Sequence, residues 1–422
     1  MKTFLKKRFS LNDLKAYLKF NSDPTIWVVF ILLCIISIIE MYSSATSLIA
    51  QSVENNQPYN FHILRHLRFL LIGIAFVWVL HYVPFKWVRY GGYFVLAVSI
   101  GLLIIILKGA SINAVNFIRV VSENEASRWV MILGVKFQPS EIAKLSLIIV
   151  VADLISRIRE GITKQIWYFW SIMAIVVTVC GLILFENFST AALLFLVVFL
   201  MMFVGQISWK YLVGTVAVLA VVLIVGFMLV KTVPEEKMPN AFHRAYTWVN
   251  RAENHINDKD TTYLITDKNR QVMHSKFAIV RGGIIGVLPG NSEQCHYLPG
   301  AFSDFIFAII IEEMGLIGGI FVILLYLVLL YRAGRIATQS KTVFSAVIVI
   351  GLTLIIVIQA FIHMAVATNL GPVTGQPLPL ISRGGTSTII TCIYIGIILR
   401  ATRQIRREKQ IKMKNEELNF KS

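Results

Sequence analysis

The chain has 422 residues, of which 56% are hydrophobic, and its mean hydropathy is +0.71. That apolar share excludes an ordinary soluble domain. The net charge of +17 does not indicate a nucleic-acid-binding protein, because the basic residues cluster in the tails and in short loops between apolar runs, as membrane topology requires. The four cysteines show neither disulfide nor metal-ligand spacing, so no metal site is predicted.

Residues 1–25 form a basic tail, and the apolar run that follows is too long for the core of a signal peptide, which predicts an uncleaved first span. Ten apolar runs approach the ~20 residues that a helix needs to cross a bilayer. They are residues 26–49, 66–83, 91–107, 139–157, 166–185, 188–206, 211–231, 304–331, 343–369 and 384–401. The sequence therefore predicts an all-α polytopic membrane protein with about ten transmembrane helices.

Residues 26–401 are expected to form one membrane domain, followed by a second basic tail at 402–422. Basic residues concentrate in both tails and in the loops on one side, so the positive-inside rule predicts an inner-membrane protein with both termini in the cytoplasm. Residues 108–138, 232–303 and 371–384 then face outward, and the second of these is a long loop between spans seven and eight. Because long polar loops in compact chains tend to be functional, chemistry is expected at the outer surface.

One acid, Asp304, lies where the longest outer loop re-enters an apolar run, and Glu312 and Glu313 follow deeper in the same run. Burying a carboxylate in hydrocarbon costs several kcal/mol, so these side chains should face a protein interior or a wet cavity. Two interpretations carry equal weight on residue chemistry alone. One is a functional site, and the other is a helix cap at the membrane border together with a buried ion pair.

Glu141 and Lys144 lie at the outer end of the fourth span, three residues apart, and can pair on one helix face. This pair has two possible roles. A role for Lys144 as a cation at a cavity wall that contacts a phosphate is favoured over an ion pair that only lowers the cost of burying the two charges. In the outer loop, residues 271–290 are rich in glycine but lack the context of a dinucleotide site, so a flexible loop or re-entrant bend is favoured over a phosphate cradle.

Residues 369–387 contain three prolines and four glycines and cannot form a continuous helix. Irregular backbone at membrane depth is tolerated only where protein or a water-filled cavity shelters it, so this segment should form a cavity wall or a re-entrant turn. His363 and Gln359, on the preceding span, are expected to be packing partners rather than catalysts.

Four stretches occur in order: RW-x₈-QPSEIAK, Q-x₁₀-GG-x₂-G, LPGAFSDFIFAIIIEEMGLIG and GPVTGQPLPLISRGGTS. Together they resemble the SEDS family (shape, elongation, division and sporulation), and the resemblance covers essentially all ten spans. Within that family, the basic N-terminal tail and the ENFSTA and HRAYTWVNR segments are more similar to the FtsW branch of the Bacteroidetes than to the RodA branch.

The resemblance implies an inverting peptidoglycan glycosyltransferase that polymerises lipid II into β-1,4 glycan strands on the outer face of the inner membrane, for septal cell-wall synthesis. It also implies a class B penicillin-binding protein and other division proteins as partners. No cofactor is certain, and a divalent cation, Mg²⁺ or Mn²⁺, is the one candidate. Asp304 is the predicted catalytic residue, and the predicted substrate-binding residues are Lys144, Glu141, Trp129, Arg244, Gln271, Ser382 and Gly384.

Several positions depart from the family's pattern, and two of them, Phe302 and Ser303, stand where His and Thr are usual. Asn187 stands where an acid is usual, so Glu186 is a candidate to compensate; Arg383 replaces the usual Tyr, and His363 stands where Asn is usual. Two other functions remain open. A flippase for the same lipid-linked precursor would also use broken helices and buried charges, and a non-catalytic scaffold for division proteins would not need Asp304.

Overall fold

The computed structural model describes residues 22–43, 61–107, 118–123, 126–132, 135–159, 165–232, 246, 249, 265, 269–298 and 300–421. Helices lie at all ten predicted apolar runs: α2 (Pro24–Ser43), α4 (Phe61–Leu80), α5 (Phe85–Leu107), α6 (Pro139–Arg159), α7 (Gln165–Leu184), α8 (Phe188–Val204), α9 (Trp209–Thr232), α13 (Ile306–Gln339), α14 (Val343–Ala367) and α15 (Thr386–Lys421). Helices satisfy their own backbone hydrogen bonds, as a lipid environment demands.

Eight of these helices are long and apolar enough to cross a membrane. The other two are α8, which has 17 residues, and α6, which carries Glu141, Lys144 and Asp153 within its length. The all-α, multi-pass architecture is therefore confirmed, while the count of ten spans stays a prediction for α6 and α8.

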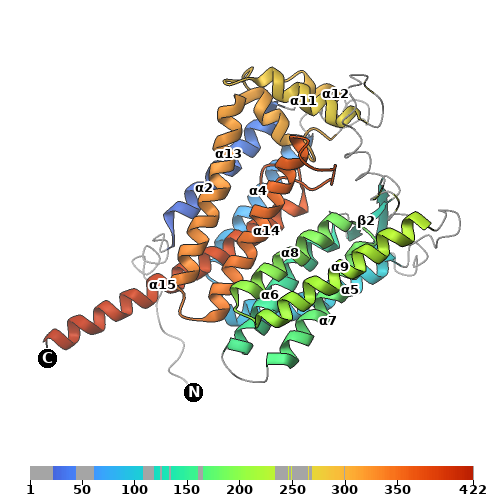
Figure 1. Ribbon diagram of the computed structural model, residues 1–422. Coiled ribbons are helices and arrows are strands. Elements are labelled where there is room, and N and C mark those ends of the chain that lie inside the picture. Colours follow the sequence, from blue (N-terminus) through green and yellow to red (C-terminus); the bar gives the residue numbers. More distant parts are fainter. Residues whose placement is uncertain are drawn as a thin grey trace.

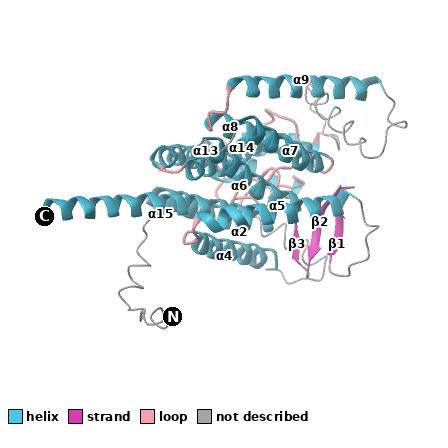
Figure 2. Ribbon diagram, turned by 90° about the horizontal axis from the view of Figure 1, so that it is seen from below, coloured by secondary structure: helices cyan, strands magenta, loops and turns pink. Residues whose placement is uncertain are grey.

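The helices α6 and α14 form the centre of the bundle. Nearly every α6 residue from Pro139 to Ser156 is buried, and α6 packs against α5, α7, α8 and α14. In contrast, α9 contacts the bundle mainly through α8 and has only Leu212 and Val230 buried (Figure 2). Between Lys210 and Lys231 the exposed side chains of α9 are apolar, as expected for a helix that faces lipid.

One end of the bundle carries elements that the sequence did not predict. The outer loop contains α11 (Arg270–Gly282) and the short α12 (Gln294–Tyr297). An antiparallel three-stranded sheet of β1 (Ile118–Glu123), β2 (Ala126–Ile132) and β3 (Val135–Phe137) lies beside the end of α5 (Figures 1 and 2). The basic tail predicted after residue 401 is helical, because α15 continues through it to Lys421 and extends away from the opposite end of the bundle (Figure 1).

The helix α13 is broken at Gly315, which has a φ of 68°. The glycine-rich end of α11 fills the break. The N–H of Leu316 donates to the carbonyl of Gly283 at 3.0 Å, and the N–H of Leu288 donates to the carbonyl of Glu313 at 2.9 Å. The segment that follows α11 therefore supplies hydrogen-bond partners to the interrupted helix, which agrees with a bend rather than a phosphate cradle.

The approach of the two backbones is close enough to require glycine. A Cβ atom on Gly286 would lie 2.2 Å from the carbonyl oxygen of Glu313, and one on Gly315 would lie 2.2 Å from the carbonyl oxygen of Ile284. Gly286 also has a φ of 89°, a backbone conformation that L side chains rarely adopt.

Candidate functional site

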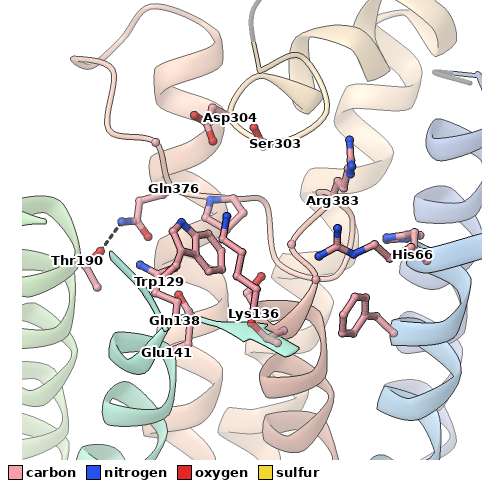
Figure 3. A pocket seen from close by; sticks show the side chains of 18 of the residues that line it. His66, Trp129, Lys136, Gln138, Glu141, Thr190, Ser303, Asp304, Gln376 and Arg383 are labelled. Carbon is pink, nitrogen blue, oxygen red and sulfur yellow. Dashed lines mark hydrogen bonds between the residues drawn. The ribbon is translucent and has the colours of Figure 1, made fainter. Parts of the chain in front are cut away.

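A polar cavity of about 420 Å³ lies at the end of the bundle that carries the sheet. It is bounded by the first turns of α4, α6, α8 and α15, by β2 and β3, by the turn before α13, and by the segment between α14 and α15. The lining residues are His62, Arg65, His66, Phe69, Trp129, Lys136, Gln138, Glu141, Asn187, Thr190, Ser303, Asp304, Gly375, Gln376, Pro377, Arg383, Gly384, Gly385, Thr386 and Ser387. In Figure 3, Asp304 and Ser303 lie on one side of it, Arg383 and His66 on another, and Trp129, Gln138 and Glu141 across from these.

Asp304 lies in a turn just before α13, which begins at Ile306 rather than at the predicted 304. The N–H of Asp304 donates to the carbonyl of Gly300 at 2.9 Å, which closes the turn. Two glycines flank the carboxylate: Cβ atoms built on Gly300 and Gly375 would lie 3.7 and 3.6 Å from Asp304 Oδ2. Both glycines have positive φ, so side chains are excluded there and the half-buried carboxylate keeps its approach to the cavity.

The Pro- and Gly-rich segment forms a cavity wall, as predicted. Its Ser382 hydroxyl accepts from the N–H of Leu378 at 2.7 Å and donates to the carbonyl of Ser303 at 2.8 Å. The N–H of Arg383 donates to the carbonyl of Phe302 at 2.9 Å. These bonds tie the segment to the turn that carries Asp304. Ser382 itself is buried and does not line the cavity, whereas Gly384 does.

His363 on α14 connects the α14–α15 segment to the start of α13. Its Nδ1 lies 2.8 Å from the carbonyl oxygen of Gln376, and its Nε2 accepts from the N–H of Phe307 at 3.4 Å. Because a carbonyl only accepts, Nδ1 carries the proton and Nε2 is the acceptor. The side chain of Gln376 then donates to the Thr190 hydroxyl at 2.7 Å, a bond drawn in Figure 3. His363 is a packing partner, as expected.

Glu141 and Lys144 form the predicted pair, with 2.7 Å between Oε1 and Nζ. Glu141 lines the cavity, but Lys144 does not, because its side chain is 1% exposed and lies behind the wall. There Lys144 also donates to Gln359 Oε1 at 3.2 Å, and Gln359 donates to the carbonyl of Pro377 at 2.9 Å. The expectation that Lys144 lies at the cavity surface is wrong, since burial directs its charge into the α6–α14 interface.

Cations that the sequence interpretation did not assign line the cavity instead: Arg65, Lys136 and Arg383. Lys136 Nζ lies 4.8 Å from the ring centroid of Trp129, a predicted substrate-binding residue that does line the cavity. The positive side chains come from α4, β3 and the α14–α15 segment, so only the tertiary fold brings them together. In the sequence, the one indication of a cation at this cavity was that Arg383 stands where the family usually has Tyr.

Arg383 is held in a defined position. Its NH2 lies 2.6 Å from Nδ1 of His62, which must act as the acceptor because a guanidinium only donates. Burial lowers the pKa of Arg383, and the positive charge of Arg65 lowers it further. Arg65 lies three residues after His62 on α4, so it is on the same side of that helix as the contact with Arg383.

The remaining predicted positions lie elsewhere or differ in role. Gln271 is on α11 and does not line the cavity, and Arg244 falls outside the described residues. Asn187 lines the cavity and caps α8, since its side chain accepts from the N–H of Thr190 at 3.3 Å. Glu186 is buried and does not line the cavity, so the structure does not place it as a substitute for the missing acid.

Glu312 and Glu313 contact residues of the 232–303 loop and of α2, and they do not line the cavity. Glu312 Oε1 lies 3.3 Å from Arg281 NH1, and Glu312 Oε2 accepts from the Ser292 hydroxyl at 2.5 Å. Glu313 accepts from the hydroxyl of Ser43 on α2. Of the two interpretations of these acids, the buried ion pair therefore holds for Glu312, and neither acid lines the cavity.

The cavity offers two carboxylates, Asp304 and Glu141, of which Glu141 is paired with Lys144. Among the described residues, no group of three or more His, Cys, Asp or Glu side chains could hold a metal ion. Mg²⁺ commonly uses one or two protein carboxylates together with substrate phosphates. Asp304 therefore fits a cation that a phosphorylated substrate brings with it.

The FtsW/RodA/SpoVE family model, described as cell cycle protein, matches residues 23–407. The probable peptidoglycan glycosyltransferase FtsW of Coxiella burnetii is 29% identical over 381 residues, which cover 89% of this chain and 95% of that protein. The corresponding protein of Hahella chejuensis is 31% identical over 376 residues, which cover 85% of each chain.

Two solved structures share the fold. A chain from a peptidoglycan synthase complex that coordinates polymerization and crosslinking has a TM-score of 0.68 at 20% identity, covering 91% of this chain and 98% of that one. The rod shape determining protein RodA of Thermus thermophilus has a TM-score of 0.61 at 19% identity, covering 92% and 98%. Since the family model spans nearly the whole chain and a relative above 30% identity covers most of it, this chain belongs to the FtsW/RodA/SpoVE family.

Proposed function

We propose that this chain is a peptidoglycan glycosyltransferase that polymerises lipid II into β-1,4 glycan strands for septal cell-wall synthesis. The observation that carries the proposal is the cavity, where the Asp304 carboxylate and several cationic side chains line one polar space in a membrane protein of this family. Its relatives from C. burnetii and H. chejuensis bear the name of that activity.

The orientation of α15 supports an outward-facing cavity. This helix begins beside the cavity at Thr386 and carries Arg403, Arg406 and Arg407 in its distal half. The positive-inside rule assigns the distal half, and with it the C-terminus, to the cytoplasm. The cavity then lies at the outer face of the inner membrane. The N-terminal tail, which is also basic, is assigned to the cytoplasm by the same rule.

A site on that face has no access to ATP, so the leaving group must arrive on the substrate. A polyprenyl diphosphate meets this need and explains a reaction site close to the bilayer. Asp304 takes the proton from the 4-hydroxyl of the acceptor GlcNAc, and the oxygen attacks the anomeric carbon of the donor sugar. The cations that line the cavity offset the negative charge that develops on the departing diphosphate. One displacement inverts an α-linked donor into a β-1,4 linkage.

Glu141 and Trp129 line the same cavity, which supports a role for them in contacting the sugars, and Lys144 pairs with Glu141 from behind the wall. A divalent cation, Mg²⁺ or Mn²⁺, would be held by Asp304 and by the substrate's own phosphates, and would add positive charge beside the diphosphate. The displacement balances in protons and electron pairs without this cation.

A flippase for the same precursor is the second candidate, because α13 is broken and the α14–α15 segment is irregular. The interior below the cavity favours the polymerase. There, beyond Lys144 and Gln359, α6 and α14 pack through buried apolar residues such as Ile148 and Leu352, which supports a closed interior at this interface. A non-catalytic scaffold would not need the Asp304 carboxylate to line a polar cavity.

A class B penicillin-binding protein is the proposed partner, together with other division proteins. The similar chain in the peptidoglycan synthase complex belongs to an assembly that couples polymerization to crosslinking. Polymerised strands need a transpeptidase that crosslinks them, so coupling the two enzymes places substrate and acceptor together.

The test is product analysis with labelled lipid II in detergent, using the purified chain together with its partner. A ladder of glycan strands supports a polymerase, since detergent offers no second leaflet to which a flippase could move its substrate. Lipid II that stays monomeric in detergent, yet crosses the bilayer of a reconstituted vesicle, would contradict the proposal and favour the flippase.

A further inference from the structure

Two guanidinium groups that line the cavity form no ion pair with a carboxylate of the described residues. In the part of the chain that the structure describes, Arg89, Arg157, Arg281 and Arg332 each form an ion pair with an acid. Within the same described ranges, Arg65 and Arg383 form none, although both line the cavity and Arg383 contacts His62, one helical turn before Arg65. Two positive side chains that line one cavity repel each other, and an anion between them would relieve the repulsion.

Three hydrogen bonds within the protein fix the position of Arg383. Its main-chain N–H bonds to Phe302, its side chain donates to His62, and the neighbouring Ser382 hydroxyl bonds to Ser303. The contact with His62 occupies one nitrogen of a group that has five N–H donors, so donors remain for a ligand. A planar guanidinium that is already oriented matches the oxygens of a phosphate in a bidentate manner.

We propose that Arg383, together with Arg65, holds the leaving diphosphate of the lipid-linked donor. This inference rests on the proposed polymerase function and names the residues that meet its leaving group. The proton of the acceptor hydroxyl goes to Asp304, a bond forms from that oxygen to the anomeric carbon, and the bond from this carbon to the diphosphate oxygen breaks. The electron pair leaves with the diphosphate, whose added charge the two guanidinium groups balance.

The hydrogen bonds of the turn that carries Asp304 indicate that Arg383 binds the diphosphate of the donor lipid rather than that of the acceptor lipid. Arg383 and Ser382 bond to Phe302 and Ser303, which directly precede Asp304. In the displacement, the base, the attacking oxygen, the anomeric carbon and the leaving oxygen lie within about one sugar ring of each other. The diphosphate of an acceptor lipid lies a disaccharide further from the attacking hydroxyl, and so further from Asp304.

The first measurement is binding of undecaprenyl diphosphate to the full-length purified protein in detergent, with undecaprenol as the uncharged comparison. Arg383→Gln and Arg65→Gln should each weaken diphosphate binding about tenfold to a hundredfold, the loss expected when charge-assisted hydrogen bonds are removed. Arg383→Lys should lose less, because it keeps the charge but not the fork. Binding of undecaprenol should not change. Arg68→Gln is the matched control, since Arg68 lies on the same helix as Arg65 and does not line the cavity.

The second measurement is the rate of glycan synthesis by Arg383→Gln. A leaving-group role predicts a lower rate at saturating lipid II, whereas an acceptor-binding role would raise KM alone and overturn the donor assignment. Diphosphate binding by Arg383→Gln at the wild-type level would overturn the subsite itself. If the wild type makes no glycan, the polymerase proposal fails instead, and the binding measurement still reports on the anion subsite by itself.

Discussion

The buried pair beneath the cavity offers a direct measurement of what Lys144 does. Replacing Lys144 with Met removes the ammonium group that lies 2.7 Å from Glu141 and 3.2 Å from Gln359, and keeps an unbranched chain of similar length. Both charged side chains are almost fully buried, at 1% and 8% exposed, so solvent replaces the lost partner only in part, at the side of Glu141 that lines the cavity. The carboxylate of Glu141 would be left buried and uncompensated.

Breaking a buried ion pair in this way costs about 3–5 kcal/mol. The pair itself contributes less than that figure, because burying both charges already carries a desolvation penalty. The double variant Glu141→Gln, Lys144→Met removes both charges together and should therefore recover most of the stability lost by Lys144→Met.

Thermal unfolding of the three variants and the wild type in the same detergent measures this recovery. Lys144→Met should unfold at a clearly lower temperature than the double variant. The reasoning would be refuted if Lys144→Met kept wild-type stability while losing lipid II binding. That result would mean that the lysine reaches the substrate directly, as the sequence pattern indicated.

Three further predictions concern the cavity wall, the broken helix and the diphosphate subsite. His363→Ala should lower kcat by about tenfold or more, because it leaves the Gln376 carbonyl and the Phe307 N–H without partners, while His363→Asn should retain most activity since it keeps a donor and an acceptor; equal losses in the two variants would count against the link. Gly286→Ala should lower the unfolding temperature in detergent more than Gly283→Ala, because both have positive φ but only the Cβ at Gly286 meets backbone, and equal effects would contradict the close approach. Added Mg²⁺ should raise the polymerisation rate of Arg383→Gln by a larger factor than that of the wild type, since a divalent cation can replace the missing positive charge; an equal factor would argue against Arg383 at the diphosphate.

The apolar runs predicted the helices well because the bilayer sets both their length and their composition. The first predicted run, 26–49, gave a described helix at Pro24–Ser43, and the run at 343–369 gave Val343–Ala367. The break at Gly315 was not predictable in the same way. A single glycine within an apolar run does not reveal a kink, which forms only because the end of α11 supplies hydrogen bonds to the interrupted backbone.

The sheet was missed for a related physical reason. Strands β1 to β3 have only six, seven and three residues and lie in the segment between two predicted spans, and their hydrogen bonds join neighbours that hydropathy does not identify. The fold of the outer loop around Glu312 was also missed, because the spacing of acids along a helix does not say which element packs against it.

The candidate site was predicted where motifs are local and missed where the fold assembles it. Asp304, Glu141, Trp129 and Gly384 were predicted from short stretches, and all four line the cavity. The spacing of Glu141 and Lys144 predicted that they pair, but not that Lys144 faces away from the cavity. Arg65 and Arg383 lie in parts of the chain that are far apart, so only tertiary structure shows that they face one space.

The most direct test of this account is the rate of lipid II polymerisation by Asp304→Asn, purified with its partner and compared with the wild type. Asparagine keeps the shape of the side chain but cannot accept the proton, so the rate should fall about a hundredfold or more while lipid II binding is retained. Glycan strands made by Asp304→Asn at the wild-type rate would contradict the role of Asp304 as the base.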